Sequence, residues 1–214
     1  MIAAPLDLGS GELSALAPHL SEDERERARR FHFDAHRHRF IVARARLRQL
    51  LGQYLGIDPR QVDFVYGPHG KPALADHLNA AAIEFNVAHS GDLALYAFTL
   101  GSPVGVDIEQ VREIPEALAI AEHYFSDDEL AQMLEVPPSE RLLSFFLAWT
   151  RKEAMLKAGG KGLSVPLREI SVSVDPSAPA LVHAATDAAG AGSWSLYHLD
   201  PARGYAAALA ILSQ

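Results

Sequence analysis

Three carboxylates in two distant segments of the chain are candidate ligands for a divalent cation. In the segment GVDIEQ, Asp107 and Glu109 are two residues apart, so in a β-strand both side chains project from the same face. Glu153 falls on the apolar stripe of a predicted helix, between Trp149 and Leu156, where a partly buried carboxylate needs a partner. Three oxygen ligands and no cysteine favour Mg²⁺ over zinc. A salt bridge from Glu153 to a neighbouring lysine or arginine is the alternative explanation.

Lysine is concentrated in one short segment. The chain has four lysines and fifteen arginines, and the stretch WTRKEAMLKAGGKG holds three of the lysines. Because a desolvated lysine can lose its proton and an arginine in practice cannot, this cluster predicts proton transfer or phosphate binding. Lys157 follows Glu153 by one helical turn and is expected to act, with Lys161 assisting and Lys152 solvated. An ordinary helix ion pair between Glu153 and Lys157 is the alternative.

Charge and composition restrict the classes of ligand. The formal net charge is −8, which argues against general nucleic-acid binding, yet residues 27–48 contain eight arginines and a single acid, Asp34. This basic segment favours a confined anionic ligand over a polyanion. The absence of cysteine excludes disulfides, a thiolate nucleophile and a cysteine zinc site. We find no signal-peptide pattern and no apolar run of roughly 20 residues, so we expect no membrane association and a cytoplasmic location.

Hydrophobic periodicity predicts an α+β protein with antiparallel strands. Ser21 and Glu24 form a capping box at the start of a helix, and helical periodicity continues from Phe31 to Leu55. A second long helix follows Pro138-Ser139 and ends at Gly159-Gly160, after a pair of shorter helices interrupted near Ser126. Strands are expected at VDFVYG, at IEFNVAHS and DLALYAFTL joined by a turn at Ser90-Gly91-Asp92, at VGVDIEQV, and at LREISVSVD, SWSLYHLD and GYAAALAIL, with a flexible turn from Ala184 to Gly192.

These motifs together resemble one enzyme family. GVDIE, followed about forty residues later by W-x-x-K-E-A-x-x-K-A and then K-G-L, resembles the 4′-phosphopantetheinyl transferases of the surfactin-synthetase-activating type. ERERARRF, Gly70-Lys71-Pro72, FNVAHS and FSDDEL occur in the family order, from about Ser21 to the C-terminus. The resemblance implies two pseudo-twofold-related halves, 1–102 and 103–214. Each would be a small antiparallel sheet packed on a long helix, with the active site at their interface.

The resemblance also implies an activity and the residues that perform it. The activity is transfer of the phosphopantetheine arm from coenzyme A to a serine of an apo acyl or peptidyl carrier protein of fatty-acid, polyketide or nonribosomal-peptide synthesis. Adenosine 3′,5′-bisphosphate is the by-product, and a monomer is expected. Asp107, Glu109 and Glu153 would hold Mg²⁺, and Glu153 and Lys157 would be catalytic. The coenzyme A contacts would be Arg27, Arg30, Arg39, Gly70, Lys71, Pro72, His89, Ser90 and Lys161. The alternatives are a coenzyme A-binding regulator without catalysis and a metal-dependent pyrophosphohydrolase.

Two departures from the family pattern affect these expectations. A basic position expected to contact the 3′-phosphate appears here as Glu24, so Arg30 or Arg39 is expected to compensate. The opening MIAAPLDLGS is short, so the first half is expected to lack an edge strand or to use a shortened one. By resemblance, the segment from Glu113 to Leu134 lies near the carrier-docking surface. Its alternative explanation is simple core packing of two short helices.

Overall fold

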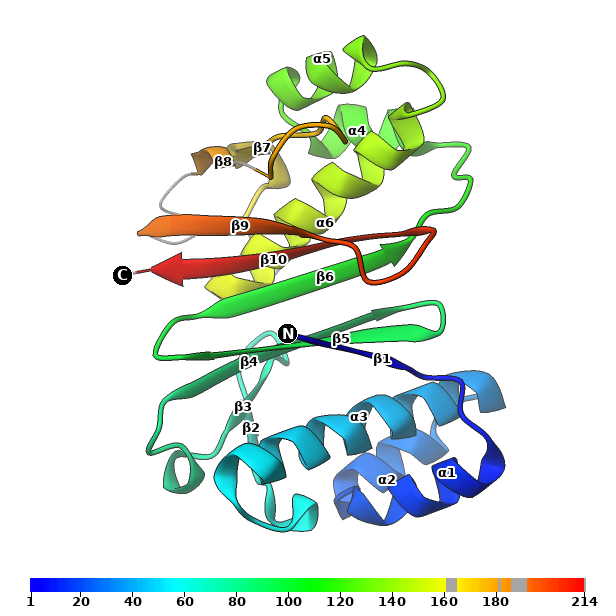
Figure 1. Cartoon of the computed structure of the whole chain (residues 1–214), viewed down its shortest axis with the longest axis vertical. Coiled ribbons are helices and arrows are strands. Elements are labelled where there is room, and N and C mark those ends of the chain that lie inside the picture. The colour runs from blue at the N-terminus through cyan, green and yellow to red at the C-terminus, as the bar shows by residue number, and fades with distance from the viewer. Residues whose placement is uncertain (161–164, 181, 186–191, 214) are drawn as a thin grey trace.

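The computed structural model describes residues 1–160, 165–180, 182–185 and 192–213. Six strands form two three-stranded antiparallel sheets with the orders β1-β5-β4 and β6-β10-β9. Helices α1, α2 and α3 lie at one end of the molecule and α4 and α5 at the other, with the two sheets between them (Figure 1). The strands of the sheets are β1 (Ile2–Pro5), β4 (Ile83–Ser90), β5 (Leu93–Leu100), β6 (Val104–Gln110), β9 (Ser193–Leu199) and β10 (Tyr205–Ser213).

The helix that follows Ser21 starts where the sequence predicts, whereas the helix Ser10–Leu16 was not predicted. Ser21 and Glu24 form the expected capping box, in which the Ser21 amide donates to the Glu24 carboxylate at 3.0 Å. The predicted helix from Phe31 begins three residues later, because Phe33 is extended. The helices are α1 (Ser10–Leu16), α2 (Glu22–Arg29) and α3 (Asp34–Leu55). Leu47 and Leu51 of α3 pack in one core with Phe85 and Tyr96 of the first sheet.

The N-terminal segment forms a shortened edge strand, which was one of the two expected outcomes. Strand β1 has four residues and pairs antiparallel with β5, from Ile2 opposite Tyr96 to Pro5 opposite Leu93. The amide of Leu6 then donates to the carbonyl of Asp92 at 2.7 Å, which extends the pairing beyond the strand.

Alternation along the central strands places side chains in three different cores. Val106 and Ile108 of β6 enter a cluster shared between the two sheets, as expected, together with Leu95 of β5 and Ala207 of β10. The opposite face of the second sheet packs on α6 (Arg141–Gly159). Because both faces of β10 are buried, its sequence is an almost continuous apolar run without polar alternation. The Asp107 side of β6 therefore faces a helix and not solvent.

The predicted helix pair is interrupted at Ser126. Ser126 caps the second helix of the pair by accepting a hydrogen bond from the amide of Glu129.

One expectation about α6 is wrong: Lys152 is not solvated. Its side chain is 1% exposed, and its ammonium forms an ion pair with Glu129, which is buried as well. The reason is that α4 and α5 cover the side of α6 that the sheet leaves open. The helices of the pair are α4 (Ala117–Tyr124) and α5 (Asp127–Glu135).

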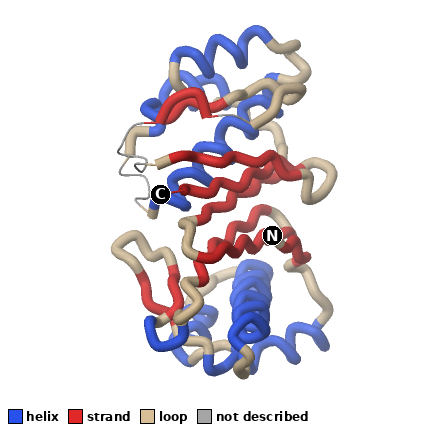
Figure 2. The backbone as a smooth tube through the Cα atoms, turned by 60° about the vertical axis from the view of Figure 1, so that its left-hand side comes forward, coloured by secondary structure: helices blue, strands red, loops and turns tan. Residues whose placement is uncertain are grey.

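Two short hairpins complete the fold. They pair β2 (Phe64–Tyr66) with β3 (Pro72–Leu74), and β7 (Ile170–Val172) with β8 (Val182–Ala185). Strand β8 includes Ala184 and Ala185, which the sequence assigned to a turn; residues 186–191 of that turn lie outside the described residues. In Figure 2 the β2–β3 hairpin lies at the left, and its loop reaches toward the second half. Across the described ranges, no helix has the length and apolar content that a membrane span requires.

Candidate active site

The contact between β6 and α6 brings the predicted chemical groups together. Gly105 allows the close approach, since a Cβ atom there would lie 1.9 Å from the carbonyl oxygen of Ala154. With the helix backbone directly on the strand, the Lys157 ammonium reaches Asp107 and donates to its Oδ1 at 2.5 Å. The ion pair of Lys157 with Glu153, which was the alternative explanation, is therefore replaced by an ion pair with a residue of the strand.

Asp107 is a buried carboxylate whose charge is incompletely compensated. It is 5% exposed, and its Oδ2 has no hydrogen-bond partner among the described residues. Burial raises the pKa of Asp107 to about 7, against the opposing effect of the Lys157 cation. The carboxylates of Glu109 and Glu153 raise this pKa further, which shows that the three acids are close enough to repel one another.

The other two carboxylates interact electrostatically with this pair. Glu153 is half-buried, as its place on the apolar stripe predicts, and burial raises its pKa. The Lys157 ammonium opposes that shift, whereas Glu109 adds to it. Glu109 is oriented by Ser90, whose hydroxyl donates to Oε2 at 2.7 Å and accepts from the amide of Gln110 at 3.1 Å. Ser90 thus contacts the acidic cluster directly.

The carboxylates fit a hard cation in charge and chemistry, although they are not yet arranged around one. In the part of the chain that the structure describes, no three histidine or acidic side chains form a ready-made metal position. The unpaired Oδ2 of Asp107 and the mutual repulsion of the three acids are nevertheless what a divalent ion would relieve. Lys157 is the cation that lies against Asp107 in this structure.

Three adjoining cavities lead away from this cluster. The Lys157 cavity, of about 330 Å³, is lined by Gly70, Lys71, Pro72, Val87, Glu153 and Lys157 among others. It shares Pro72 and Val87 with the His89 cavity, of about 180 Å³. The His89 cavity in turn shares Arg27 and Arg44 with the Arg30 cavity, of about 630 Å³. The shared residues make the three cavities neighbours, from Glu153 and Lys157 to helix α2.

The Gly70-Lys71-Pro72 loop joins the two halves of the molecule. Gly70 has φ +77°, a left-handed conformation that glycine adopts without strain. The Lys71 ammonium donates to the carbonyl of Lys157 at 2.8 Å and to that of Val104 at 3.2 Å. Burial lowers the pKa of Lys71, partly offset by Glu84. Lys71 therefore connects the β2–β3 hairpin to the C-terminal end of α6.

His89 lies at the end of β4, in the wall of the cavity that bears its name. The residue is exposed as a whole, but neighbouring protein draws its ring partly out of water, and this lowers its pKa. The Lys157 cation lowers the pKa of His89 further, whereas Glu109 raises it. A mainly neutral imidazole next to the acidic cluster can donate or accept a hydrogen bond.

The basic residues expected to bind the ligand fall in different places. Arg27 lines two of the cavities, with its guanidinium carbon 5.2 Å from the centroid of the Phe40 ring, and Arg30 lines the outermost cavity. Arg39 lines none of these three cavities and donates two hydrogen bonds of 2.7 Å to Asp7, while its cation also lowers the pKa of His89. Lys161 lies outside the described residues.

Two family models match successive parts of this sequence. The family model described as "4'-phosphopantetheinyl transferase superfamily" matches residues 103–210, and the model "4'-phosphopantetheinyl transferase, N-terminal" matches residues 9–100. The 4′-phosphopantetheinyl transferase HetI of Nostoc sp. is 39% identical over 207 residues, which cover 97% of this chain and 84% of HetI. The chain belongs to the 4′-phosphopantetheinyl transferase superfamily.

A second relative and one solved structure are similar to this chain at lower sequence identity. The 4′-phosphopantetheinyl transferase Sfp of Bacillus subtilis strain 168 is 33% identical over 153 residues, covering 72% of this chain and 66% of Sfp. These relatives make the chain a phosphopantetheinyl transferase of the Sfp type. A holo-(acyl-carrier-protein) synthase of Bacillus anthracis, solved with CoA (3',5'-ADP), is 21% identical, covers 51% of this chain and 94% of its own, and has a TM-score of 0.44.

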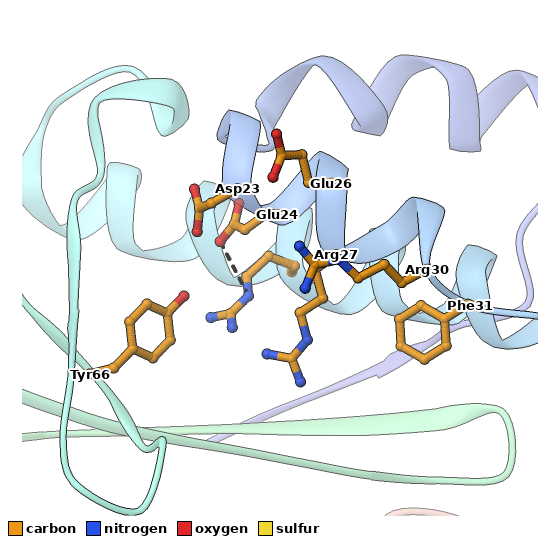
Figure 3. Close-up of a pocket in the computed structure, with 8 residues that line it drawn as sticks. Asp23, Glu24, Glu26, Arg27, Arg30, Phe31 and Tyr66 are labelled. Atoms are coloured by element: carbon orange, nitrogen blue, oxygen red, sulfur yellow. Dashed lines mark ion pairs between the residues drawn. The ribbon is translucent and has the colours of Figure 1, made fainter.

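The structure of this transferase adds residues that sequence reasoning missed. Arg44 and Tyr66 line the Arg30 cavity, and Figure 3 shows Tyr66 on the opposite side of that cavity from Arg27. Arg44 was one of eight arginines in a basic segment, and its four-residue spacing to Arg48 was the available signal. Glu24, the departure from the family pattern, is buried and pairs with both of these arginines.

The segment after β6 contains both core and surface positions. Phe125 is buried in the core of the transferase, so the packing explanation is confirmed for that residue. Leu118 and Leu134 are instead exposed, at 46% and 44%. They border a separate cavity of about 380 Å³ together with Ile114, Leu142 and Phe145.

Proposed function

We propose that this chain transfers the 4′-phosphopantetheine arm of coenzyme A to a serine of an apo acyl or peptidyl carrier protein and releases adenosine 3′,5′-bisphosphate. Membership of the superfamily supports the reaction class. The observation that carries the proposal is the row of three adjoining cavities, which begins at Arg27 of α2 and ends at Glu153 and at Lys157, the partner of Asp107. Such a row suits a long ligand with anionic groups at two places.

Coenzyme A would lie along this row of cavities with its pyrophosphate at the inner end. Lys157 and His89 would contact the pyrophosphate, and Lys71 would face it from the hairpin loop. The adenosine end would pass Gly70 and Pro72 toward Arg27. Ser90, Arg30, Arg39 and Lys161 complete the proposed contacts; of these, Ser90 supports the site through Glu109.

Asp107, Glu109 and Glu153 would hold a magnesium ion, which when bound would neutralise negative charge on the pyrophosphate. The support for this assignment is the unpartnered Oδ2 of Asp107 and the raised pKa values of Asp107 and Glu153. The metal ion would then take the place of the Lys157 ammonium as the cation next to Asp107. Lys157 would be free to turn from Asp107 toward the ligand.

The chemistry requires one bond to form and one to break at the β-phosphorus. The carrier serine oxygen forms the new bond, and the bond to the leaving adenosine 3′,5′-bisphosphate oxygen breaks. Glu153, whose pKa is raised by burial, would accept the serine proton directly or through water. Lys157 would stabilise or protonate the leaving phosphate, since charge accumulates there in the transition state.

The site would lie between two pseudo-twofold-related halves that meet near residue 102. Strand order supports this, because in each sheet the first strand of the half pairs with the last, and the last with the middle. A chain that contains both halves would act as a monomer. The groove bordered by Ile114, Leu118 and Leu134 would receive the carrier protein.

The decisive experiment is a mass measurement on a panel of apo acyl and peptidyl carrier proteins, incubated with the full chain, coenzyme A and Mg²⁺. The expected result is a carrier that gains the mass of one phosphopantetheine arm, while Glu153→Gln gives none. Free phosphopantetheine with unmodified carriers would identify a pyrophosphohydrolase. Coenzyme A binding without any product would identify a non-catalytic regulator. Either of the last two results would overturn the proposal.

A further inference from the structure

Tyr205, a residue outside the site described above, holds the Ser90-Gly91-Asp92 turn of the first half against the second half. It is the first residue of β10 and lies opposite Gln110 of β6. Its hydroxyl donates to the Asp92 carboxylate at 2.6 Å and accepts from the Asp92 amide at 3.4 Å. In Figure 1 the turn between β4 and β5 and the start of β10 lie on the same side of the molecule. One phenol oxygen therefore joins the two halves.

The turn packs closely on this tyrosine. The Tyr205 ring is partly buried against the core cluster between the two sheets, so its hydroxyl has a defined position. A Cβ atom at Gly91 would lie 2.5 Å from the hydroxyl oxygen of Tyr205 and 3.0 Å from Oε1 of Gln110. Tyr205 and Gln110 thus form the surface on which the backbone of the turn lies.

The same turn carries the hydroxyl that orients Glu109. Ser90 donates to Oε2 of Glu109 at 2.7 Å and accepts from the amide of Gln110 at 3.1 Å. Gln110 therefore contacts Ser90 through its amide and is the residue opposite Tyr205 in the sheet. The two hydroxyls cross the boundary between the halves in opposite directions. Ser90 reaches from the first half to β6, and Tyr205 reaches from the second half to Asp92.

Side chains set the position of the turn relative to β6. Strands β4 and β6 belong to different sheets, so no ladder of backbone hydrogen bonds fixes one to the other. The bond from the Leu6 amide to the Asp92 carbonyl stays within the first half. A hydrogen bond from a hydroxyl to a carboxylate at 2.6 Å is short and charge-assisted, hence among the stronger kinds. The Tyr205–Asp92 pair is therefore suited to fix this turn.

We propose that Tyr205 is a positioning residue of the metal site. Its hydroxyl holds the Ser90-Gly91-Asp92 turn, the turn keeps the Ser90 hydroxyl in place, and that hydroxyl fixes the orientation of Glu109. This inference rests on the proposed function, which assigns Glu109 to Mg²⁺. A group that orients a metal ligand increases the affinity for the ion, and its loss typically weakens binding by about ten- to a hundred-fold. Because Tyr205 acts one step farther from the ligand than Ser90, we expect a smaller effect.

The test measures binding of Mn²⁺, a paramagnetic substitute for Mg²⁺, to the full chain with and without coenzyme A, by electron paramagnetic resonance of the free ion. Tyr205→Phe keeps the ring and its packing but removes the hydroxyl. It is expected to weaken Mn²⁺ binding by about three- to ten-fold, below the effect of losing a direct partner of the ligand. Tyr197→Phe is the matched control, because Tyr197 lies on the adjacent strand β9 and is 49% exposed. It should bind Mn²⁺ like the wild type.

A double-variant cycle shows whether Tyr205 acts through Ser90. Ser90→Ala removes the link between the turn and Glu109, so adding Tyr205→Phe should cause no further loss of Mn²⁺ affinity. A merely structural role would instead lower stability to urea without changing the affinity. Asp92→Asn keeps an acceptor for the Tyr205 hydroxyl and should bind Mn²⁺ nearly as the wild type does. Asp92→Ala should match Tyr205→Phe.

The other outcomes separate this inference from the proposed function. Wild-type Mn²⁺ affinity in Tyr205→Phe, or additive losses in the double variant, overturns the role of Tyr205 and leaves the transferase reaction intact. A wild type that binds Mn²⁺ but modifies no carrier overturns the proposed function, while the affinities still decide the role of Tyr205. A wild type that binds no Mn²⁺ under either condition overturns the metal assignment and this inference with it. If Tyr205→Phe does not fold by circular dichroism, Asp92→Ala tests the same contact from its other side.

Discussion

The ammonium of Lys157 lies 2.5 Å from a carboxylate oxygen of Asp107, fifty residues away in sequence and on the strand that supports its helix. This pair replaces the helical pair of Lys157 with Glu153 that spacing alone favours. It leaves Glu153 half-buried without that partner and leaves one oxygen of Asp107 unsatisfied. In this site, one ammonium therefore lies among three acids and compensates only part of their negative charge.

The first prediction concerns pH and metal-free stability. The pKa of Asp107 is raised from 3.8 to about 7, so the folded protein holds this proton more tightly than the unfolded chain. Between these two values the unfolded chain ionises first, and stability falls as pH rises, by on the order of a few kcal/mol. Urea unfolding in a chelator at several pH values measures the fall. Asp107→Asn should remove this component, and Mg²⁺ should reduce it in the wild type; superimposable pH profiles of wild type and variant would contradict the assignment.

The second prediction separates two lysines of α6. Lys152→Met leaves Glu129 as an unpaired buried charge, so it should destabilise the fold by roughly 3–5 kcal/mol. Lys157→Met should have a smaller effect on stability, because Asp107, whose pKa is already about 7, can take up a proton when its cation is removed, but it should abolish carrier modification. Urea denaturation and the carrier mass assay provide the two readouts. Equal stability losses in the two variants would show that Lys157 is structural as well.

The third prediction tests how Ser90 acts. Its hydroxyl orients Glu109, so Ser90→Ala should raise the Mg²⁺ concentration for half-maximal rate by about ten-fold, as expected for loss of a group that orients a metal ligand. The rate at saturating Mg²⁺ should change little. Ser90→Thr keeps the hydroxyl and should restore the wild-type Mg²⁺ response. A Ser90→Ala variant with unaltered Mg²⁺ response would exclude this role.

The fourth prediction concerns the strand–helix contact that assembles the site. Gly105→Ala would force a Cβ atom into the backbone of α6 at Ala154, so the helix must shift or the fold must lose stability. We expect a loss of at least about 3 kcal/mol, at the upper end of overpacking effects, together with loss of activity. Gly11→Ala is the control, since nothing lies within 4 Å of that position in α1. It should be neutral or slightly stabilising.

Local patterns were sufficient for most secondary structure and for part of the site. The capping box at Ser21, the Ser90-Gly91-Asp92 turn and the interruption of the helix pair near Ser126 depend on residues near in sequence, so short-range rules predict them. The shared face of Asp107 and Glu109 follows from strand alternation in the same way. Lys152 could not be placed by such rules, because its partner Glu129 and the covering helix α5 come from another segment.

The sequence by itself determined the family, the antiparallel α+β class and the candidate groups, because motif spacing and side-chain periodicity are properties of the chain alone. Only the tertiary structure decided which group meets which. It pairs Lys157 with Asp107, places Arg44 in the lining of two cavities and pairs Arg39 with Asp7. The physical reason is that charge pairing depends on distance in space and on burial, and both arise when β6 packs on α6 and the β2–β3 hairpin folds against α3.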